Sequence, residues 1–151
     1  MDYDSTSDTL KHIRRVQQLL GESARELMVR GERHDESKLS EAEKPAFDRE
    51  TPKLKELTFG SDEYKASLAR LGEALKHHYA ANSHHPEHYE NGVAGMDLFD
   101  LVEMVMDWKA ASERNKGAQI NLSISFERFE IEPQLRSIIE NTARRLGWIG
   151  G

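Results

Sequence analysis

The sequence contains no cysteine, so disulfide bonds and thiolate metal sites are excluded. It also lacks any apolar run approaching the ~20 residues that a membrane-spanning helix needs. The net charge of −6 gives no basic surface of the kind that binds duplex nucleic acid non-specifically. The first residues, Met1–Ser5, are acidic and polar, unlike a signal peptide. We therefore expect no stable duplex nucleic-acid partner, no membrane partner and a cytoplasmic location (the host cytoplasm if a phage encodes the chain).

Proline and glycine are scarce, at 4 and 10 residues, and the apolar residues recur mostly at helical spacing. We expect an all-α fold, a compact single-domain helical bundle over residues 1–151. The predicted helices cover about Thr6–Arg30, a short piece from Glu41, another from Thr51, Asp62–Asn82, Asp97–Asn115 and Pro133–Leu146. Residues 83–95 read as a loop. Apolar residues alternate in 118–131, which favours a strand, but one isolated strand is poorly stable, so we expect an irregular arm or a short helix.

Local signals place the helix ends. Gly31 is expected to terminate the first helix, and Ser40 with Glu43 to form a capping box. Ser61 and Asp97 are expected to cap the helices that follow them. The same pattern predicts inward-facing leucines in the long helix before residue 82.

Histidine is concentrated in one place: five of the seven histidines lie within the stretch His77–His88. At about 100° per residue, His78, Asn82 and His85 lie on the side of the helix that carries core leucines. A buried imidazole needs partners for both ring nitrogens. A satisfied core histidine or a helix C-terminal cation would explain one such residue, but five together favour binding of a metal or a phosphate. Helix phase favours His78 over His77 and does not decide between His84 and His85.

Carboxylates and a lysine accompany the histidines. Lys38 follows the pair His34-Asp35 at a distance that suits a phosphate oxygen, although a solvated charged turn would look the same. Asp107 sits in an apolar helix and needs a metal, a histidine or an arginine from the first helix as its partner. Glu103, one turn earlier, is expected to orient a ligand histidine. This donor chemistry suits one or two ions of Mn, Fe, Co, Ni or Zn.

The ordered set His12, His34-Asp35 and Asp107 resembles the signature of the HD superfamily of metal-dependent phosphohydrolases. The run His34–Lys38 is similar to that family's His-Asp-x-[Gly/Ser]-Lys turn. More closely, His34–Ser40 together with His77–Tyr89 resembles a small uncharacterised HD-like family common in phages and bacteria. The resemblance implies an all-α domain of the HD type with a metal site between its helices. It also implies that Asp35 bridges two metals, one held by His12, His34 and Asp107, the other by His78 and His84 or His85.

The function expected from this resemblance is hydrolysis of a phosphoester, with a nucleotide as the substrate class. Asp35 and Lys38 are the candidate catalytic residues, and Glu87 or a histidine that binds no metal is the candidate proton donor to the leaving group. Lys38, Asn82 and His88 are the candidate substrate-binding residues. The alternatives are a di-iron oxygenase of the same superfamily and a non-catalytic protein that sequesters a nucleotide. A homo-oligomer is compatible with the sequence.

Overall fold

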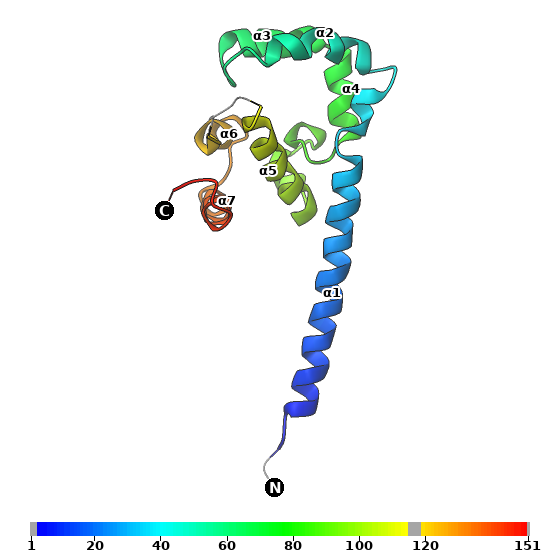
Figure 1. The fold of residues 1–151 in the computed structure, drawn as a ribbon, viewed down its shortest axis with the longest axis vertical. Coiled ribbons are helices and arrows are strands. Elements are labelled where there is room, and N and C mark those ends of the chain that lie inside the picture. The colour runs from blue at the N-terminus through cyan, green and yellow to red at the C-terminus, as the bar shows by residue number, and fades with distance from the viewer. Residues whose placement is uncertain (1–2, 115–118, 151) are drawn as a thin grey trace. The chain divides into compact units, whose positions relative to one another are not determined.

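The computed structural model describes residues 3–114 and 119–150, and every regular element in that part of the chain is a helix (Figure 1). The all-α prediction is therefore confirmed. The chain divides into two compact units, residues 1–34 and 35–151. The expectation of one domain stays a prediction. No helix among the described residues is long and apolar enough to cross a membrane.

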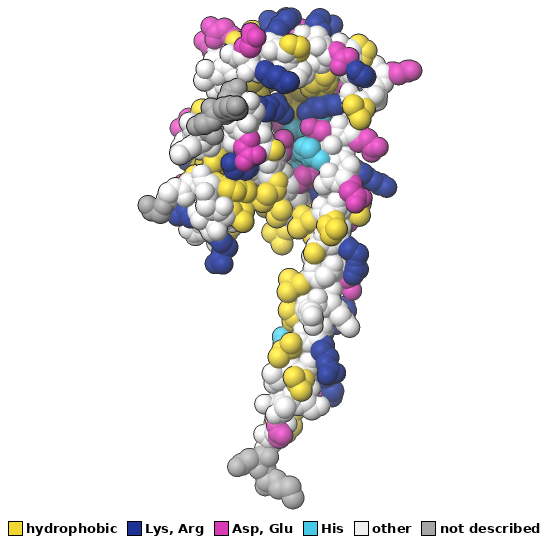
Figure 2. All heavy atoms as spheres, in the orientation of Figure 1, with side chains coloured by type: hydrophobic (Ala, Val, Ile, Leu, Met, Phe, Trp, Pro, Cys, Tyr) yellow, Lys and Arg dark blue, Asp and Glu magenta, His cyan; other side chains and the backbone are white. Residues whose placement is uncertain are grey.

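The first unit is one unbroken helix, α1 (Thr6–Arg33). It continues through Gly31, so the predicted stop at Arg30 is wrong by three residues, and His34 forms its C-cap. A glycine ends a helix only when its backbone turns left-handed, and Gly31 instead keeps a helical conformation. Figure 2 shows hydrophobic side chains along one side of α1 and lysine and arginine side chains along the other.

The second unit starts with a tight turn. Asp35 adopts a left-handed backbone with φ 56°, which aspartate tolerates better than most residues. A short 3-10 helix follows, η1 (Glu36–Leu39), and then α2 (Lys44–Leu54). The predicted capping box is wrong: α2 begins at Lys44, and Glu43 is fully buried against histidines instead of bonding back to Ser40. The separate helix expected from Thr51 is also wrong, because Pro52 lies inside α2 near its end.

Two helices replace the long helix predicted before residue 82. Ser61 caps the N-terminus of α3 (Asp62–Leu71), as predicted: its Oγ accepts from the Tyr64 backbone N–H at 3.1 Å. Gly72 then takes φ 51°, a conformation that favours glycine, and α4 (Glu73–Ala81) starts in a new direction. α2 packs on α3, where the buried Glu50 accepts from Ser67 and Arg70 at 3.1 and 3.0 Å. This contact fixes the position of α2, whose N-cap is Glu43.

The remaining helices form the hydrophobic core. Two 3-10 turns, η2 (Pro86–His88) and η3 (Gly92–Gly95), lead into α5 (Leu98–Ser112). Asp97 caps α5 in a full capping box with Asp100. For residues 118–131 we expected an irregular arm or a short helix. The structure has a short helix there, α6 (Leu122–Arg128), and residue 118 lies outside the described residues. α7 (Pro133–Arg145) ends one residue before the prediction.

Buried side chains of α5, α6, α7 and the segments that flank α6 pack together and hold α5 in place. The cluster consists of Met104, Val105, Ile120, Leu122, Phe126, Ile131, Ile139 and Ala143. Burying one large aliphatic or aromatic side chain of this kind stabilises a fold by about 1.5–3 kcal/mol. Met104 and Val105 thus anchor α5, and the neighbouring side of the same helix carries Glu103 and Asp107.

Candidate metal centre

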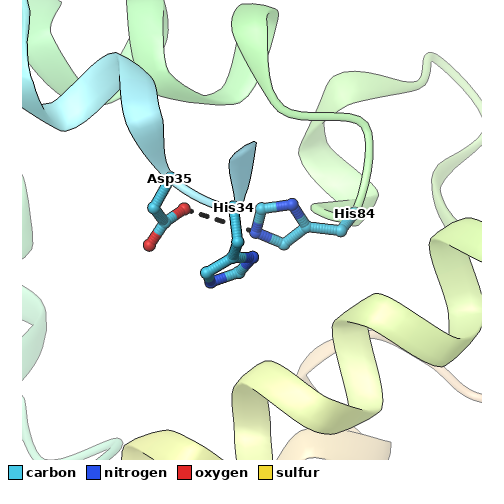
Figure 3. A group of neighbouring side chains, drawn as sticks. All are labelled: His34, Asp35 and His84. Atoms are coloured by element: carbon cyan, nitrogen blue, oxygen red, sulfur yellow. Dashed lines mark ion pairs between the residues drawn. The ribbon is translucent and has the colours of Figure 1, made fainter. Parts of the chain in front are cut away.

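The side chain of Asp35 meets two buried histidines. Its Oδ1 atom lies 3.3 Å from His78 Nε2 and 3.5 Å from His84 Nε2. His78 comes from α4, and His84 from the turn that follows it; both are 2% exposed. Figure 3 shows Asp35 and His84 with the ion pair between them, together with His34, the chain neighbour of Asp35. Residues far apart in the sequence therefore converge on one carboxylate.

A carboxylate contacts the far side of each of these two rings: Glu43 is fully buried, and Glu103 is 13% exposed. His78 Nδ1 lies 3.0 Å from Glu43 Oε2, and His84 Nδ1 lies 3.0 Å from Glu103 Oε1. A neutral imidazole has one N–H, and the glutamates lie closer to the Nδ1 atoms (3.0 Å) than Asp35 lies to the Nε2 atoms (3.3 and 3.5 Å), so the geometry favours the proton on Nδ1 in both rings. The Nε2 lone pairs of His78 and His84 then face Asp35. Carboxylate–histidine pairs of this kind orient metal-binding histidines in proteins.

His85 completes the arrangement. Its Nε2 atom lies 2.9 Å from His78 Nε2, and its ring lies 4.1 Å from that of His84 between centroids. Burial, together with the adjacent His84 and His78, lowers the pKa of His85 to about 3. His85 is therefore neutral at pH 7, as a metal-binding imidazole must be.

Two overlapping groups of residues in the second unit could hold a metal ion. They are Asp35 with His78 and His85, and His84 with His85 and Asp107. In each group, one ligand atom per residue lies within 4.8 Å of the others. The shared His85 makes one ion or two adjacent ions equally compatible with the geometry. Mixed nitrogen and oxygen donors suit a transition metal better than calcium or magnesium.

The chemistry of the donors fits a cation. Asp35 Oδ1 and the two Nε2 atoms that face it are all acceptors once Glu43 and Glu103 take the Nδ1 protons. Acceptors at 3.3–3.5 Å repel one another, and a divalent ion gives each of them a favourable partner. Burial would raise the pKa of Asp35, but the His78 and His84 rings, whenever an Nε2–H points at it, and the Lys38 ammonium hold it well below the usual range. Asp35 is thus a carboxylate at neutral pH.

Lys38 brings a positive charge to this carboxylate. Its Nζ atom lies 2.5 Å from Asp35 Oδ2 and 5.2 Å from the centre of the Phe47 ring. The one-turn 3-10 helix η1 places both residues on the same side, since they are three positions apart. Lys38 therefore lies beside Asp35 of the candidate site, and its role with a phosphate stays a prediction.

The other predicted residues take varied positions. Asn82 donates to Ser37 Oγ and to the His78 carbonyl, both at 2.8 Å, so it links η1 to α4. Glu87 accepts from Arg128 at 3.1 Å. His88 is exposed, and its Nδ1 lies 2.8 Å from the Tyr79 carbonyl. The roles of Asn82 and His88 with substrate and of Glu87 as a proton donor stay predictions.

The two histidines of the first unit are His12, in the N-terminal half of α1, and His34, at its C-cap. His34 caps its C-terminus and directly precedes Asp35, and its part as a ligand stays a prediction. His12 lies on the exposed surface of α1. At 1.5 Å per residue, His12 is about 33 Å along the helix axis from His34, so one ion cannot reach both while α1 is unbroken. His12 as a metal ligand stays a prediction.

Sequence reasoning missed Glu43, which contacts two histidines. Besides His78, it contacts His77, whose Nδ1 lies 2.6 Å from Glu43 Oε1. The side chain of His77 is half exposed, whereas Glu43 is fully buried. Local sequence gave a competing signal, the apparent capping box, and nothing in it pointed to a histidine partner. Phe47, whose ring meets that of His78 edge-on with 5.6 Å between centroids, was also missed, because the local sequence does not point to a histidine partner.

The comparisons with known proteins identify a family but no activity. No curated protein and no solved structure matches the chain. Residues 1–145 match a family of unknown function, DUF5662, and this match covers the first unit, residues 35–145 of the second, and all the residues of the candidate metal centre. The chain belongs to this family of unknown function.

Proposed function

We propose that this protein is a metal-dependent phosphohydrolase that acts on a phosphoester, with a nucleotide as the substrate class. Asp35, His78, His84, His85 and Asp107 would hold one or two transition-metal ions, with His34 as a further candidate ligand. A phosphorylated metabolite of this class is found in the cytoplasm, where we expect the protein to act. The proposal rests on the resemblance to the HD superfamily and on the donor set that the fold assembles.

One observation carries the metal-binding part of the proposal. Glu43 and Glu103 each lie 3.0 Å from the Nδ1 atom of a buried histidine, and both Nε2 atoms face the same oxygen of Asp35. A histidine buried for packing alone needs no such shared target for its second nitrogen. Two rings oriented in this way by two carboxylates form a preorganised ligand set, for which a metal ion is the natural occupant.

Residues around this set favour an anionic substrate. Lys38 lies beside Asp35, and its ammonium can offset charge on a phosphoryl group bound there. Glu87, on the turn η2 and paired with Arg128, is the candidate proton donor to the leaving group. A bound divalent ion would supply Lewis-acid polarisation of the phosphoryl group and activation of water near pH 7. The residues of the chain would then orient the substrate and deliver the proton.

The test is a metal and activity analysis with a matched control. Purified wild type, Asp35→Asn and Asp48→Asn are loaded with Mn²⁺, analysed for metal content and screened against nucleoside mono-, di- and triphosphates. Asp48 is an exposed aspartate of α2 paired with Lys44, so its variant controls for the loss of one carboxylate. We expect phosphate release from wild type and Asp48→Asn, and none from Asp35→Asn.

Other outcomes would replace the proposal. Iron in the purified protein together with oxygen consumption and no phosphate release would identify an oxygenase. A nucleotide that binds tightly and is recovered unchanged after long incubation with Mn²⁺ would identify a sequestering protein. Phosphate release by Asp35→Asn at the wild-type rate would remove this site from the reaction.

A further inference from the structure

A single carboxylate of α5 bonds to both ends of the segment that carries His84 and His85. Asp100 Oδ1 accepts from the Ser83 hydroxyl at 2.6 Å, and Asp100 Oδ2 accepts from the Tyr89 hydroxyl at 2.6 Å. Ser83 directly precedes His84, and Tyr89 follows the turn η2. Asp100 is 1% exposed, so water has little access to either bond. This segment is thus tied at both ends to one buried group.

The cap of α5 does not account for these two bonds. Asp100 belongs to the capping box at the start of the helix, where its Oδ2 atom accepts from the Asp97 backbone N–H at 3.2 Å. A capping box needs one oxygen of this residue and no hydroxyl partner. Bonds from hydroxyls to an ionised carboxylate are short and about twice as strong as those between neutral groups. Asp100 therefore attaches the histidine segment as well as capping its own helix.

The same helix carries two groups of the candidate metal centre. Asp100, Glu103 and Asp107 are three and four positions apart, so they lie on one face of α5. Glu103 contacts His84 Nδ1 at 3.0 Å, and Asp107 forms a possible metal-binding group with His84 and His85. The helix is itself anchored in the hydrophobic core. One face of α5 therefore holds the histidine segment at its two ends and between them.

The backbone of the segment gives it little rigidity of its own. Residues 83–89, all of which the structure describes, contain one regular element, the single 3-10 turn η2. Sites built on loops are less precise than sites built on helices unless other contacts fix them. Gly95 allows one such contact, because a Cβ at this position would lie 2.7 Å from Tyr89 Cβ. The Tyr89 side chain can therefore pack closely against η3 with its hydroxyl at Asp100.

We propose that Asp100, acting through Ser83 and Tyr89, is a positioning residue that sets His84 and His85 at the spacing a transition-metal ion requires. The inference rests on the metal-binding part of the proposed function. Asp100 fixes the chain on either side of the two histidines, and the imidazole rings follow. Loss of either hydroxyl leaves every candidate ligand in the chain but lets the segment move. The ion is then bound more weakly and in a less defined geometry.

The experiment measures Co²⁺ binding to full-length variants by visible absorption, which reports both the affinity and the geometry of the ligands. Ser83→Ala and Tyr89→Phe each delete one hydroxyl, whereas Ser83→Thr keeps it. We expect the Kd for Co²⁺ to rise about 10-fold or more in the two deletion variants, as is typical when a contact that orients a metal ligand is lost. Their absorption spectra should also change. Ser83→Thr should retain the wild-type Kd and spectrum.

Ser67→Ala is the matched control for these variants. Ser67 is a fully buried serine that donates to the buried Glu50 at 3.1 Å, so its variant loses the same kind of hydrogen bond away from the candidate site. Ser67→Ala should unfold at a lower urea concentration in chelator. It should nevertheless keep the wild-type Kd and absorption spectrum with Co²⁺.

The results distinguish this inference from the proposed function. A wild type that binds no Co²⁺ would overturn the metal centre and the positioning role together. A wild type that binds Co²⁺ with the same Kd and spectrum as Ser83→Ala and Tyr89→Phe would overturn the positioning role alone. An equal loss of affinity in Ser67→Ala would also overturn it, because the effect would then follow from lower stability in general.

Discussion

Glu43→Gln is the substitution that most clearly separates a metal centre from an ordinary buried histidine cluster. Glu43 is fully buried and accepts from His78 at 3.0 Å and from His77 at 2.6 Å. Glutamine keeps the size of the side chain but removes its negative charge and turns one oxygen into a donor. The variant can no longer hold both rings as the glutamate does. His78 Nε2 should therefore lose its fixed direction toward Asp35.

The expected size of the effect follows from linkage between metal binding and folding. Removing a carboxylate that orients a ligand histidine typically weakens metal binding 10–100-fold. At a free metal concentration one hundred times the wild-type Kd, the metal stabilises the wild-type fold by about 2.7 kcal/mol. At the same concentration the increment in Glu43→Gln should fall to about 0.4–1.4 kcal/mol. The assay is urea unfolding with Mn²⁺ and with chelator, and the difference between the two gives the increment.

Glu50→Gln is the matched control, because Glu50 is also a buried glutamate of the same region but contacts cations and Ser67 instead of histidines. This variant should be less stable with chelator and should keep the full wild-type metal increment. The reasoning would be refuted if Glu43→Gln kept the full increment, or if both variants lost the same share of it.

Three further predictions concern pH, catalysis and the backbone. Burial alone would raise the pKa of Glu50, but hydrogen bonds from Lys53, Arg70, Arg49 and Ser67 lower it to about 2. Its carboxylate therefore stabilises the fold fully above its ordinary pKa of about 4.3, and this contribution is lost as pH falls through 2. In urea unfolding between pH 2 and 7, the unfolding free energy of Glu50→Gln should fall less steeply toward low pH than that of wild type. An unchanged slope would contradict the assignment. Asp35→Ala should abolish phosphate release at saturating Mn²⁺, whereas Lys38→Ala should lower kcat by an amount that corresponds to at most a few kcal/mol of activation free energy. Equal losses in kcat would show that the two residues do not have the separate roles proposed for them. Gly72→Ala should lower the unfolding free energy by about 1–3 kcal/mol with or without metal, because φ 51° with ψ −121° strains any residue with a Cβ. An unchanged unfolding free energy would show that the helix break does not lie at Gly72.

Sequence predicted those parts of the fold that depend on near neighbours. Ser61 and Asp97 cap their helices as expected because each bonds backbone N–H groups two or three residues ahead. The break at Gly72 was not predicted, since an isolated glycine in a helical pattern is often tolerated and only its backbone conformation shows that it ends a helix. Pro52 was interpreted as the start of a helix, because the local sequence does not show that α2 already extends through this position.

The candidate site divides in the same way. Helix phase correctly placed His78 with Asn82 and His85, because all the counting was done within α4 and the turn after it. Glu103 was expected to orient a histidine, and it contacts His84 Nδ1. Glu43 lies 35 positions from His78, so its contact exists only after α2 and α4 have packed. Long-range contacts of this kind have no local signature, which is why the second orienting carboxylate had to come from the structure.

The most direct test of the account is the metal content of the full chain against that of a variant without the two oriented histidines. Wild type and His78→Ala/His84→Ala are incubated with Mn²⁺ or Zn²⁺, freed of excess metal by gel filtration and analysed by inductively coupled plasma mass spectrometry. Circular dichroism verifies that the variant is still helical. The account predicts at least one retained ion per wild-type chain and none in the double variant. Equal metal content in the two proteins, or no retained metal in either, would contradict it.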